Sequence, residues 1–167
     1  LAYNADGPNR RHDTDEAIQY FEEMCKNKVY SHKIKQSIET SIRYHMRMWQ
    51  LFDGMTVNHF VDMLGEITHD YKEDYEYLLK DLLLTCAADD CSDKTEHCIQ
   101  KGQTRERCKL LQIIAMDVFD ICKNIHFRDV PDYQNKKIEV VKDKQREMRI
   151  SAIKHYFKEN NYIFNKG

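Results

Sequence analysis

The sequence predicts an all-α fold, a single disulfide-stapled bundle of about seven or eight helices. The chain has 167 residues, which suits one domain with a full core. It contains only 5 Gly and 2 Pro, too few for the many tight turns of a β-sandwich or barrel. Apolar residues recur at helical spacings of three and four. We expect a flexible leader at 1–12, one helical domain at 13–160 and a C-terminal tail at 161–167.

The first two helices are expected to begin at capping residues. Asp13 and Glu16 form a capping-box-like pair at the start of a helix over about 13–28. Ser31 caps a second helix, which ends at Asp53-Gly54 because Gly adopts the left-handed conformation that closes a helix at low cost.

Two further helices follow in the middle of the chain. Thr56 caps a short helix that Gly65 weakens or ends, and a longer helix begins around Thr68. The apolar stripe of this longer helix consists of Tyr71, Tyr75, Leu78, Leu79, Leu82, Leu83 and Cys86. The stripe predicts that the helix lies along the core.

The second half begins with a polar stretch at 87–101, which is expected to contain a short helix after Ser92. Thr104 opens the most hydrophobic helix of the chain, which is apolar on most sides and therefore predicted to be central. Pro131 marks a fresh helix start. Two helices, or one helix broken near Gln145, then reach about Asn160.

Six cysteines form an even set, namely Cys25, Cys86, Cys91, Cys98, Cys108 and Cys122. A zinc site would call for Cys-x2-4-Cys pairs matched to a second pair, and no Cys-x-x-Cys occurs. We therefore predict disulfides, with Cys86 paired to Cys122, and an oxidising compartment. The polar stretch at 1–12 fits a chain from which a signal peptide has been removed, so a secreted, extracellular protein is expected.

Charge and motifs exclude several functions. The net charge is −2 with both signs mixed, so no basic face is available for nucleic acid. Apolar runs such as 82–84 are far too short to insert into a membrane. No sequence motif for a catalytic triad, a zinc site, a phosphate loop or a dinucleotide fold is present, so we expect no enzyme, metal or cofactor. We also expect a monomer.

Five residues are candidates for binding a ligand. His45 shares a face with apolar residues, and is either a satisfied core histidine or part of a pocket. Asp117 points toward an apolar surface, with Asp120 three residues on; it either pairs with an internal cation or borders the core, or the two meet a ligand cation. Tyr71 and Tyr75 are either core residues or the aromatic walls of that pocket.

The run from Glu16 to Cys122 resembles the insect odorant-binding-protein superfamily, in particular the salivary members of blood-feeding flies that scavenge host mediators. The resemblance is carried by Cys25, by the segment 49–64 with its acidic-Gly turn and short helix, and by the three later cysteines Cys86, Cys108 and Cys122. Residues 44–48 stand where that superfamily has a Cys-x3-Cys. The resemblance implies a small-molecule pocket enclosed by helices, no catalysis, and amine binding by two acids spaced like Asp117 and Asp120.

The sequence therefore favours a secreted, non-enzymatic carrier or scavenger of a host mediator such as a biogenic amine or a lipid. The alternative is a secreted helical protein that inhibits a host protein, namely a protease, a complement or haemostasis factor or a receptor, through a protein-protein surface. An enclosed apolar cavity would favour the carrier, and an exposed apolar patch would favour the inhibitor.

Overall fold

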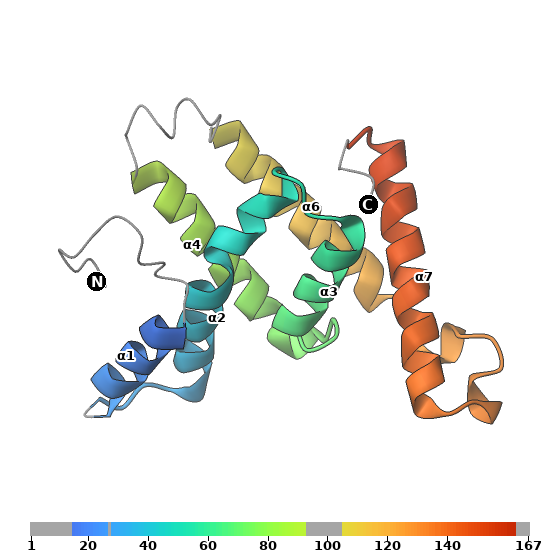
Figure 1. Ribbon diagram of the computed structural model, residues 1–167, viewed down its shortest axis with the longest axis horizontal. Coiled ribbons are helices and arrows are strands. Elements are labelled where there is room, and N and C mark those ends of the chain that lie inside the picture. The colour runs from blue at the N-terminus through green and yellow to red at the C-terminus, as the bar shows by residue number, and fades with distance from the viewer. Residues whose placement is uncertain (1–14, 27, 93–104, 163–167) are drawn as a thin grey trace.

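The computed structural model describes residues 15–26, 28–92 and 105–162, with only the backbone of 90–92 and 105 (Figure 1). The described residues form helices and no strands, which confirms the all-α prediction. The α-helices are α1 (Asp15–Cys25), α2 (His32–Met48), α3 (Val57–Ile67), α4 (Glu76–Ser92), α6 (Arg105–Lys123) and α7 (Ile138–Glu159). Short 3-10 helices are η1 (Trp49–Leu51), η2 (Glu73–Tyr75), η3 (Phe127–Asp129) and η4 (Tyr133–Asn135). The described part thus has six α-helices, not seven or eight, and the short helix expected after Ser92 lies outside it.

The helices are arranged around a central pair, α4 and α6, with α1 and α7 at opposite ends of the molecule (Figure 1). α2 packs along α4, and α7 packs against both α3 and α6. α1 packs mainly against α2. This arrangement leaves α1 as an outlying helix beside the α2–α4 pair.

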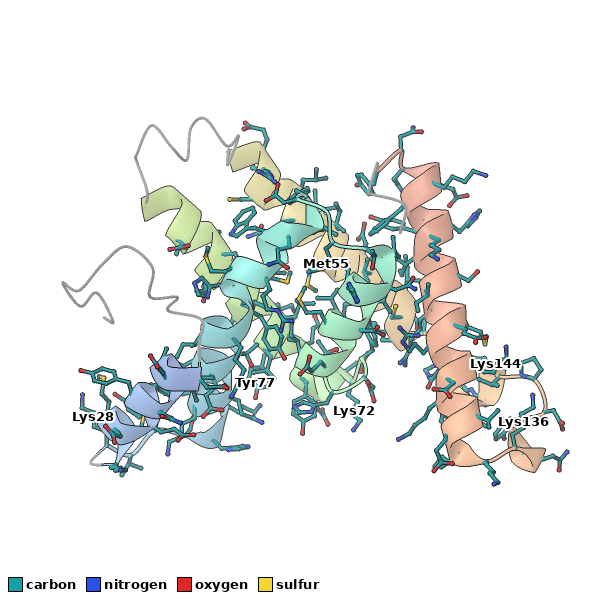
Figure 2. All side chains as sticks on the ribbon, in the orientation of Figure 1. Lys28, Met55, Lys72, Tyr77, Lys136 and Lys144 are labelled. Carbon is teal, nitrogen blue, oxygen red and sulfur yellow. The ribbon has the colours of Figure 1, made fainter. Side chains whose placement is uncertain are left out.

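The main core consists of buried side chains from α2, α3, α4, α6 and α7. α6 is central, as predicted, because Ile114, Val118 and Phe119 are fully buried. Figure 2 shows Met55 among the side chains between the central helices, whereas Lys28 and Lys136 lie at the two outer ends. The buried residues of α1, Ile18 and Cys25, do not belong to this core cluster, so α1 is attached at the side.

The expected helix start at Thr68 is wrong, because α4 begins at Glu76. His69, Asp70 and Tyr71 have φ values of 47°, 65° and 71°, which are left-handed and incompatible with a right-handed helix.

Gly65 neither ends nor breaks α3, which continues to Ile67. A Cβ at Gly65 would lie 3.2 Å from Cε2 of Tyr71, so glycine allows this ring to pack closely on the helix. The expectation that Gly65 ends the helix is therefore wrong. The absence of a side chain at Gly65 instead allows the ring of Tyr71 to approach the α3 backbone.

Two expectations near the C-terminus are also wrong. Pro131 does not start a helix, because Asp132 has a left-handed φ of 60° and α7 begins only at Ile138. α7 is not broken near Gln145. The Gln145 side chain instead donates a hydrogen bond of 2.7 Å to the Ile125 carbonyl, and so fastens α7 to the end of α6.

No disulfide joins any two of Cys25, Cys86, Cys108 and Cys122, the cysteines whose side chains the structure describes. The predicted pairing of Cys86 with Cys122 is wrong for a geometric reason. The cysteine that acts electrostatically on Cys86 is Cys108. Cys122 lies about 21 Å from Cys108 along the axis of α6, at a rise of 1.5 Å per residue. The side chains of Cys91 and Cys98 lie outside the described residues.

None of the described helices combines the length and the apolar character that crossing a membrane would require.

Candidate functional site

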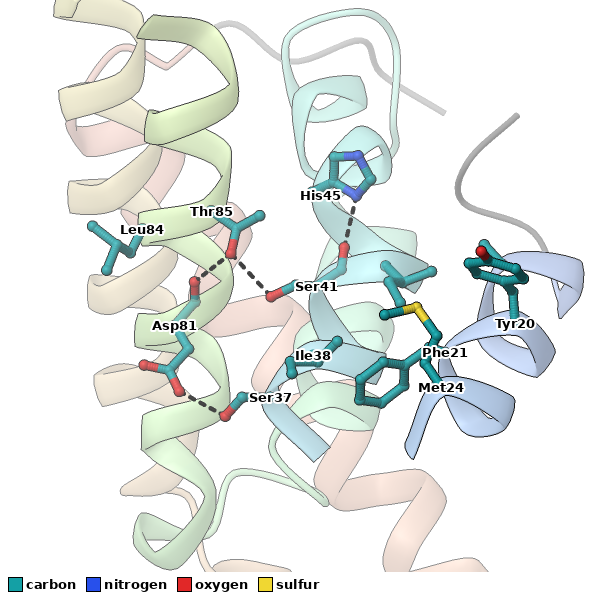
Figure 3. Close-up of a pocket in the computed structure, with 12 residues that line it drawn as sticks. Tyr20, Phe21, Met24, Ser37, Ile38, Ser41, His45, Asp81, Leu84 and Thr85 are labelled. Atoms are coloured by element: carbon teal, nitrogen blue, oxygen red, sulfur yellow. Dashed lines mark hydrogen bonds between the residues drawn. The ribbon is translucent and has the colours of Figure 1, made fainter. Parts of the chain in front are cut away.

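A cavity of about 590 Å³ lies between α1, α2 and α4 (Figure 3). It is lined by Ala17, Tyr20, Phe21, Met24, Ser37, Ile38, Ser41, Ile42, His45, Asp81, Leu84 and Thr85. Its volume falls within the range of about 300–1,000 Å³ that small-molecule sites occupy. The cavity is partly open to solvent and is lined by residues of all three helices, so it is a groove.

One wall of the groove is polar and follows the contact between α2 and α4. Ser37, Ser41 and His45 are spaced four residues apart on α2, so they lie in a row on one helix face. Asp81 and Thr85 have the same spacing on α4. The two rows meet, so the polar wall runs from His45 past Ser41 to Ser37 (Figure 3).

Hydrogen bonds tie the two rows together. Ser37 Oγ donates to Asp81 Oδ2 at 2.6 Å, and Thr85 Oγ1 donates to the Asp81 carbonyl at 2.9 Å. Ser41 Oγ lies 3.0 Å from Thr85 Oγ1 and must be the donor, because the single hydroxyl proton of Thr85 is already committed. His45 Nδ1 donates to the Ser41 carbonyl at 2.6 Å, because a carbonyl can only accept.

The other side chains that line the groove are apolar or aromatic. Ile38 and Ile42 line the groove from α2, and we name this part its floor. Phe21 and Met24 line it from α1 and form the α1 wall. Tyr20, Met24 and Leu84 are 55%, 43% and 68% exposed, so the groove presents apolar surface to water. Covering such a side chain with an apolar ligand removes it from water and contributes about 1.5–3 kcal/mol at full burial.

Among the predicted site residues, only His45 lines this groove. The sequence left open whether His45 is a satisfied core histidine or part of a pocket. His45 is both, since it is 7% exposed and hydrogen-bonded and also borders the cavity.

The two acidic residues already have protein partners and line none of the cavities described in this section. Asp117, half-buried on α6, accepts a hydrogen bond of 2.5 Å from the Tyr156 hydroxyl of α7. Burial, followed by this bond to Asp117, raises the pKa of Tyr156 well above its usual value. Asp120 is exposed and pairs with Lys123 at 2.7 Å. The expected pair of acids facing one ligand cation is therefore not assembled in this structure.

The two tyrosines are also placed away from His45. Tyr71 is 5% exposed, donates its hydroxyl proton to the Val61 carbonyl and lies beneath the guanidinium of Arg149 at 4.7 Å. Tyr75 is half-buried, with its ring centroid 4.1 Å from that of His69. Tyr71 borders a different cavity of about 590 Å³, between the α3–α4 turn and the end of α6. The five residues that were predicted to line one pocket therefore lie at separate places in the structure.

The sequence interpretation missed the polar wall, namely Ser37, Ser41, Asp81 and Thr85. A signal was present, because Ser37, Ser41 and His45 interrupt the apolar face of α2 at intervals of four. A line of small polar residues on an apolar face indicates a contact with another polar row or a solvated groove. The facing row on α4 could be matched to it only after the pairing of the two helices was known.

A second, polar cavity of about 550 Å³ lies on another face of α2. Its lining includes Arg43, Arg47, Tyr44 and Glu66. Burial and the neighbouring Glu66 carboxylate raise the pKa of Tyr44 to about 12. Cations and carboxylates are mixed here, so the cavity presents no single charge to a ligand. In the described part of the chain, no group of three or more His, Cys, Asp or Glu side chains is placed to hold a metal ion.

Comparison with protein-family models, with curated proteins and with solved structures found no significant match.

Proposed function

We propose that this protein is a non-enzymatic carrier or scavenger that binds a small, largely apolar molecule in the groove between α1, α2 and α4. The observation that carries the proposal is the groove itself, whose floor and α1 wall are apolar while a short polar row marks one side. A concave apolar surface with a few convergent polar groups is the usual form of a small-molecule site.

Of the two ligand classes considered, the groove favours a lipid-like molecule over a compact biogenic amine. Asp117 and Asp120, the acids expected to bind an amine, already have Tyr156 and Lys123 as partners. The lining of the groove is dominated by aliphatic and aromatic side chains. The resemblance to the odorant-binding-protein superfamily supports the same class of function, and secretion is proposed with it.

A protein partner is the second candidate. Tyr20, Met24 and Leu84 are exposed along the groove, and an apolar face of a partner helix could cover the same side chains. The two candidates differ in what they need from the groove. A small molecule needs the space at its floor, whereas a protein surface needs mainly its rims.

The test is a titration with the apolar fluorescent probe N-phenyl-1-naphthylamine. Ile42→Trp fills the floor of the groove, and Val140→Trp adds the same bulk at an exposed site on α7. We expect saturable binding by the wild type and by Val140→Trp, and affinity at least about tenfold weaker for Ile42→Trp because the cavity is occupied.

Circular dichroism checks that both variants are folded. Equal binding by all three proteins would place the probe elsewhere and contradict the proposed site. Absence of saturable binding by the wild type would refute the carrier and give preference to the protein-partner function.

A further inference from the structure

The geometry points to a head-group rule for this groove: it selects amphiphiles whose polar head donates hydrogen bonds, such as long-chain alcohols or amines, and Asp81 sets this preference against carboxylates. The inference rests on the proposed function and concerns what the polar wall recognises.

The first step is the location of the protons on the polar wall. Ser37, Ser41 and Thr85 each have one hydroxyl proton. Ser37 and Ser41 use theirs in the α2–α4 contact, and Thr85 uses its proton on the Asp81 carbonyl within α4. A neutral histidine ring has one N–H proton, and His45 uses it on the Ser41 carbonyl. Lone pairs remain on these oxygens, so the wall offers acceptors to a ligand.

The second step is charge. Among the residues that the structure describes, Asp81 is the only Asp or Glu that lines the groove, and no Lys or Arg of that part of the chain lines it. Its carboxylate accepts one bond from Ser37 on Oδ2, which leaves acceptor positions on both oxygens because an ionised carboxylate has about four. An anionic head placed beside it would meet like charge with no cation to compensate, whereas a cationic or hydroxyl head finds an acceptor.

The third step concerns the opposite wall. Tyr20 on α1 lines the groove, and its phenol can donate to a ligand. It is more than half exposed, and it lies on the α1 wall, across the groove from Asp81 (Figure 3). If the α2–α4 wall sets the preference, removal of this hydroxyl leaves the order of ligands unchanged.

The experiment displaces the fluorescent probe with four ligands that share one chain length: decylamine, 1-decanol, methyl decanoate and decanoate. We expect decylamine and 1-decanol to bind more tightly than methyl decanoate, which only accepts, and decanoate to bind most weakly.

Asp81→Asn keeps the shape and the acceptor for Ser37 but removes the charge. We expect it to weaken decylamine binding by about tenfold and to strengthen decanoate binding, because a hydrogen bond to a charged group and a like-charge contact are both lost. Asp74→Asn, which removes the same charge from an exposed site outside the groove, and Tyr20→Phe should both keep the wild-type order.

Three results would overturn the inference. If the wild type binds all four ligands equally, the groove is a carrier site without a head-group rule, and the proposed function stands. If Asp81→Asn behaves like Asp74→Asn, another residue sets the preference. If no ligand displaces a probe that the wild type binds, the head-group rule is refuted, whereas the carrier function is refuted only by absence of saturable probe binding.

Discussion

At Asp117, a half-buried carboxylate is stabilised by a single tyrosine hydroxyl from another helix. A carboxylate on an apolar helix face must either find a partner or shift toward its neutral form. The sequence could show that Asp117 faces apolar neighbours, but it could not show that Tyr156, far along the chain, supplies the proton. The ligand expected for Asp117 is thus replaced by a hydrogen bond within the protein.

This interpretation predicts the effect of Tyr156→Phe. The change leaves Asp117 without its donor, so the free energy of unfolding should fall by about 1–2 kcal/mol while probe binding in the groove stays unchanged. Urea denaturation measures the first quantity and fluorescence titration the second. Tyr20→Phe is the matched control, since it removes an exposed hydroxyl and should change stability by less than about 0.5 kcal/mol. Loss of probe binding in Tyr156→Phe would show that Asp117 contributes to the binding site.

Among the elements, α7 is fastened to the rest of the molecule by Arg149. Its guanidinium donates to the Cys122 carbonyl at 3.1 Å and to the Ile125 carbonyl at 3.5 Å, and it lies over the ring of Tyr71. One planar group thereby joins α7, the C-terminal end of α6 and the turn before α4. Lysine cannot reproduce this fork of donors or the stacking.

We therefore expect Arg149→Lys to lower the free energy of unfolding by about 1–3 kcal/mol and to speed hydrogen exchange in α7. Arg146→Lys is the control on the same helix, because Arg146 forms an exposed ion pair with Asp62 and such pairs contribute less than about 1 kcal/mol. Equal effects of the two substitutions would show that α7 depends on its apolar face and not on Arg149.

The helix ends differ in how well the sequence predicts them. The caps Ser31 and Thr56 and the positive φ of Gly54 are confirmed, because capping and glycine conformation are local properties. The expected end of the second helix at Asp53-Gly54 is wrong, because α2 ends at Met48 and η1 at Leu51. The start of α4 was misplaced, because Tyr71 belongs to the apolar pattern while its backbone is left-handed. Periodicity reports burial, and it does not report whether a buried residue is in a helix.

For the whole molecule, composition and the helical spacing of apolar residues were sufficient to predict an all-α protein with a central, apolar α6. The binding groove was less accessible to prediction, because it depends on which helices pair. Ser37 and Asp81 meet across 44 residues of sequence. No spacing within one helix encodes such a contact.

The buried thiols and tyrosines make the whole fold sensitive to alkaline pH. Burial raises the pKa of Cys86 to about 12 and that of Cys122 to about 11, and Tyr44 is raised to about 12. In the unfolded chain these groups ionise at about 9 for a thiol and 10 for a tyrosine. Their contribution is therefore fully present below about pH 9 and is lost as pH rises toward about 12.

We expect the melting temperature to be steady up to about pH 8 and to fall steeply as the pH rises from about 9 to 11. Thermal denaturation followed by circular dichroism, under reducing conditions, measures this fall. Cys86→Ala removes one of the groups and should reduce the steepness, although it lowers stability at neutral pH. A melting temperature that stays constant up to about pH 11 would contradict the burial of these groups as ionisable thiols and phenols.

The turn formed by His69, Asp70 and Tyr71 affects the order in which parts of the molecule fold. Left-handed backbone costs about 1–2 kcal/mol per residue outside glycine, so three such residues in succession have little tendency to form alone. Local hydrogen bonds support the turn, from the Tyr71 N–H to Thr68 Oγ1 and from the Tyr71 hydroxyl to the Val61 carbonyl. The ring of Tyr71 also packs on Phe119 and Arg149, which are far later in the chain. The ring of Tyr71 is therefore expected to reach its final packing late in folding, after α6 and α7 have docked. The groove is built from α1, α2 and α4, so the site for a ligand can assemble before the opposite end of the molecule has closed.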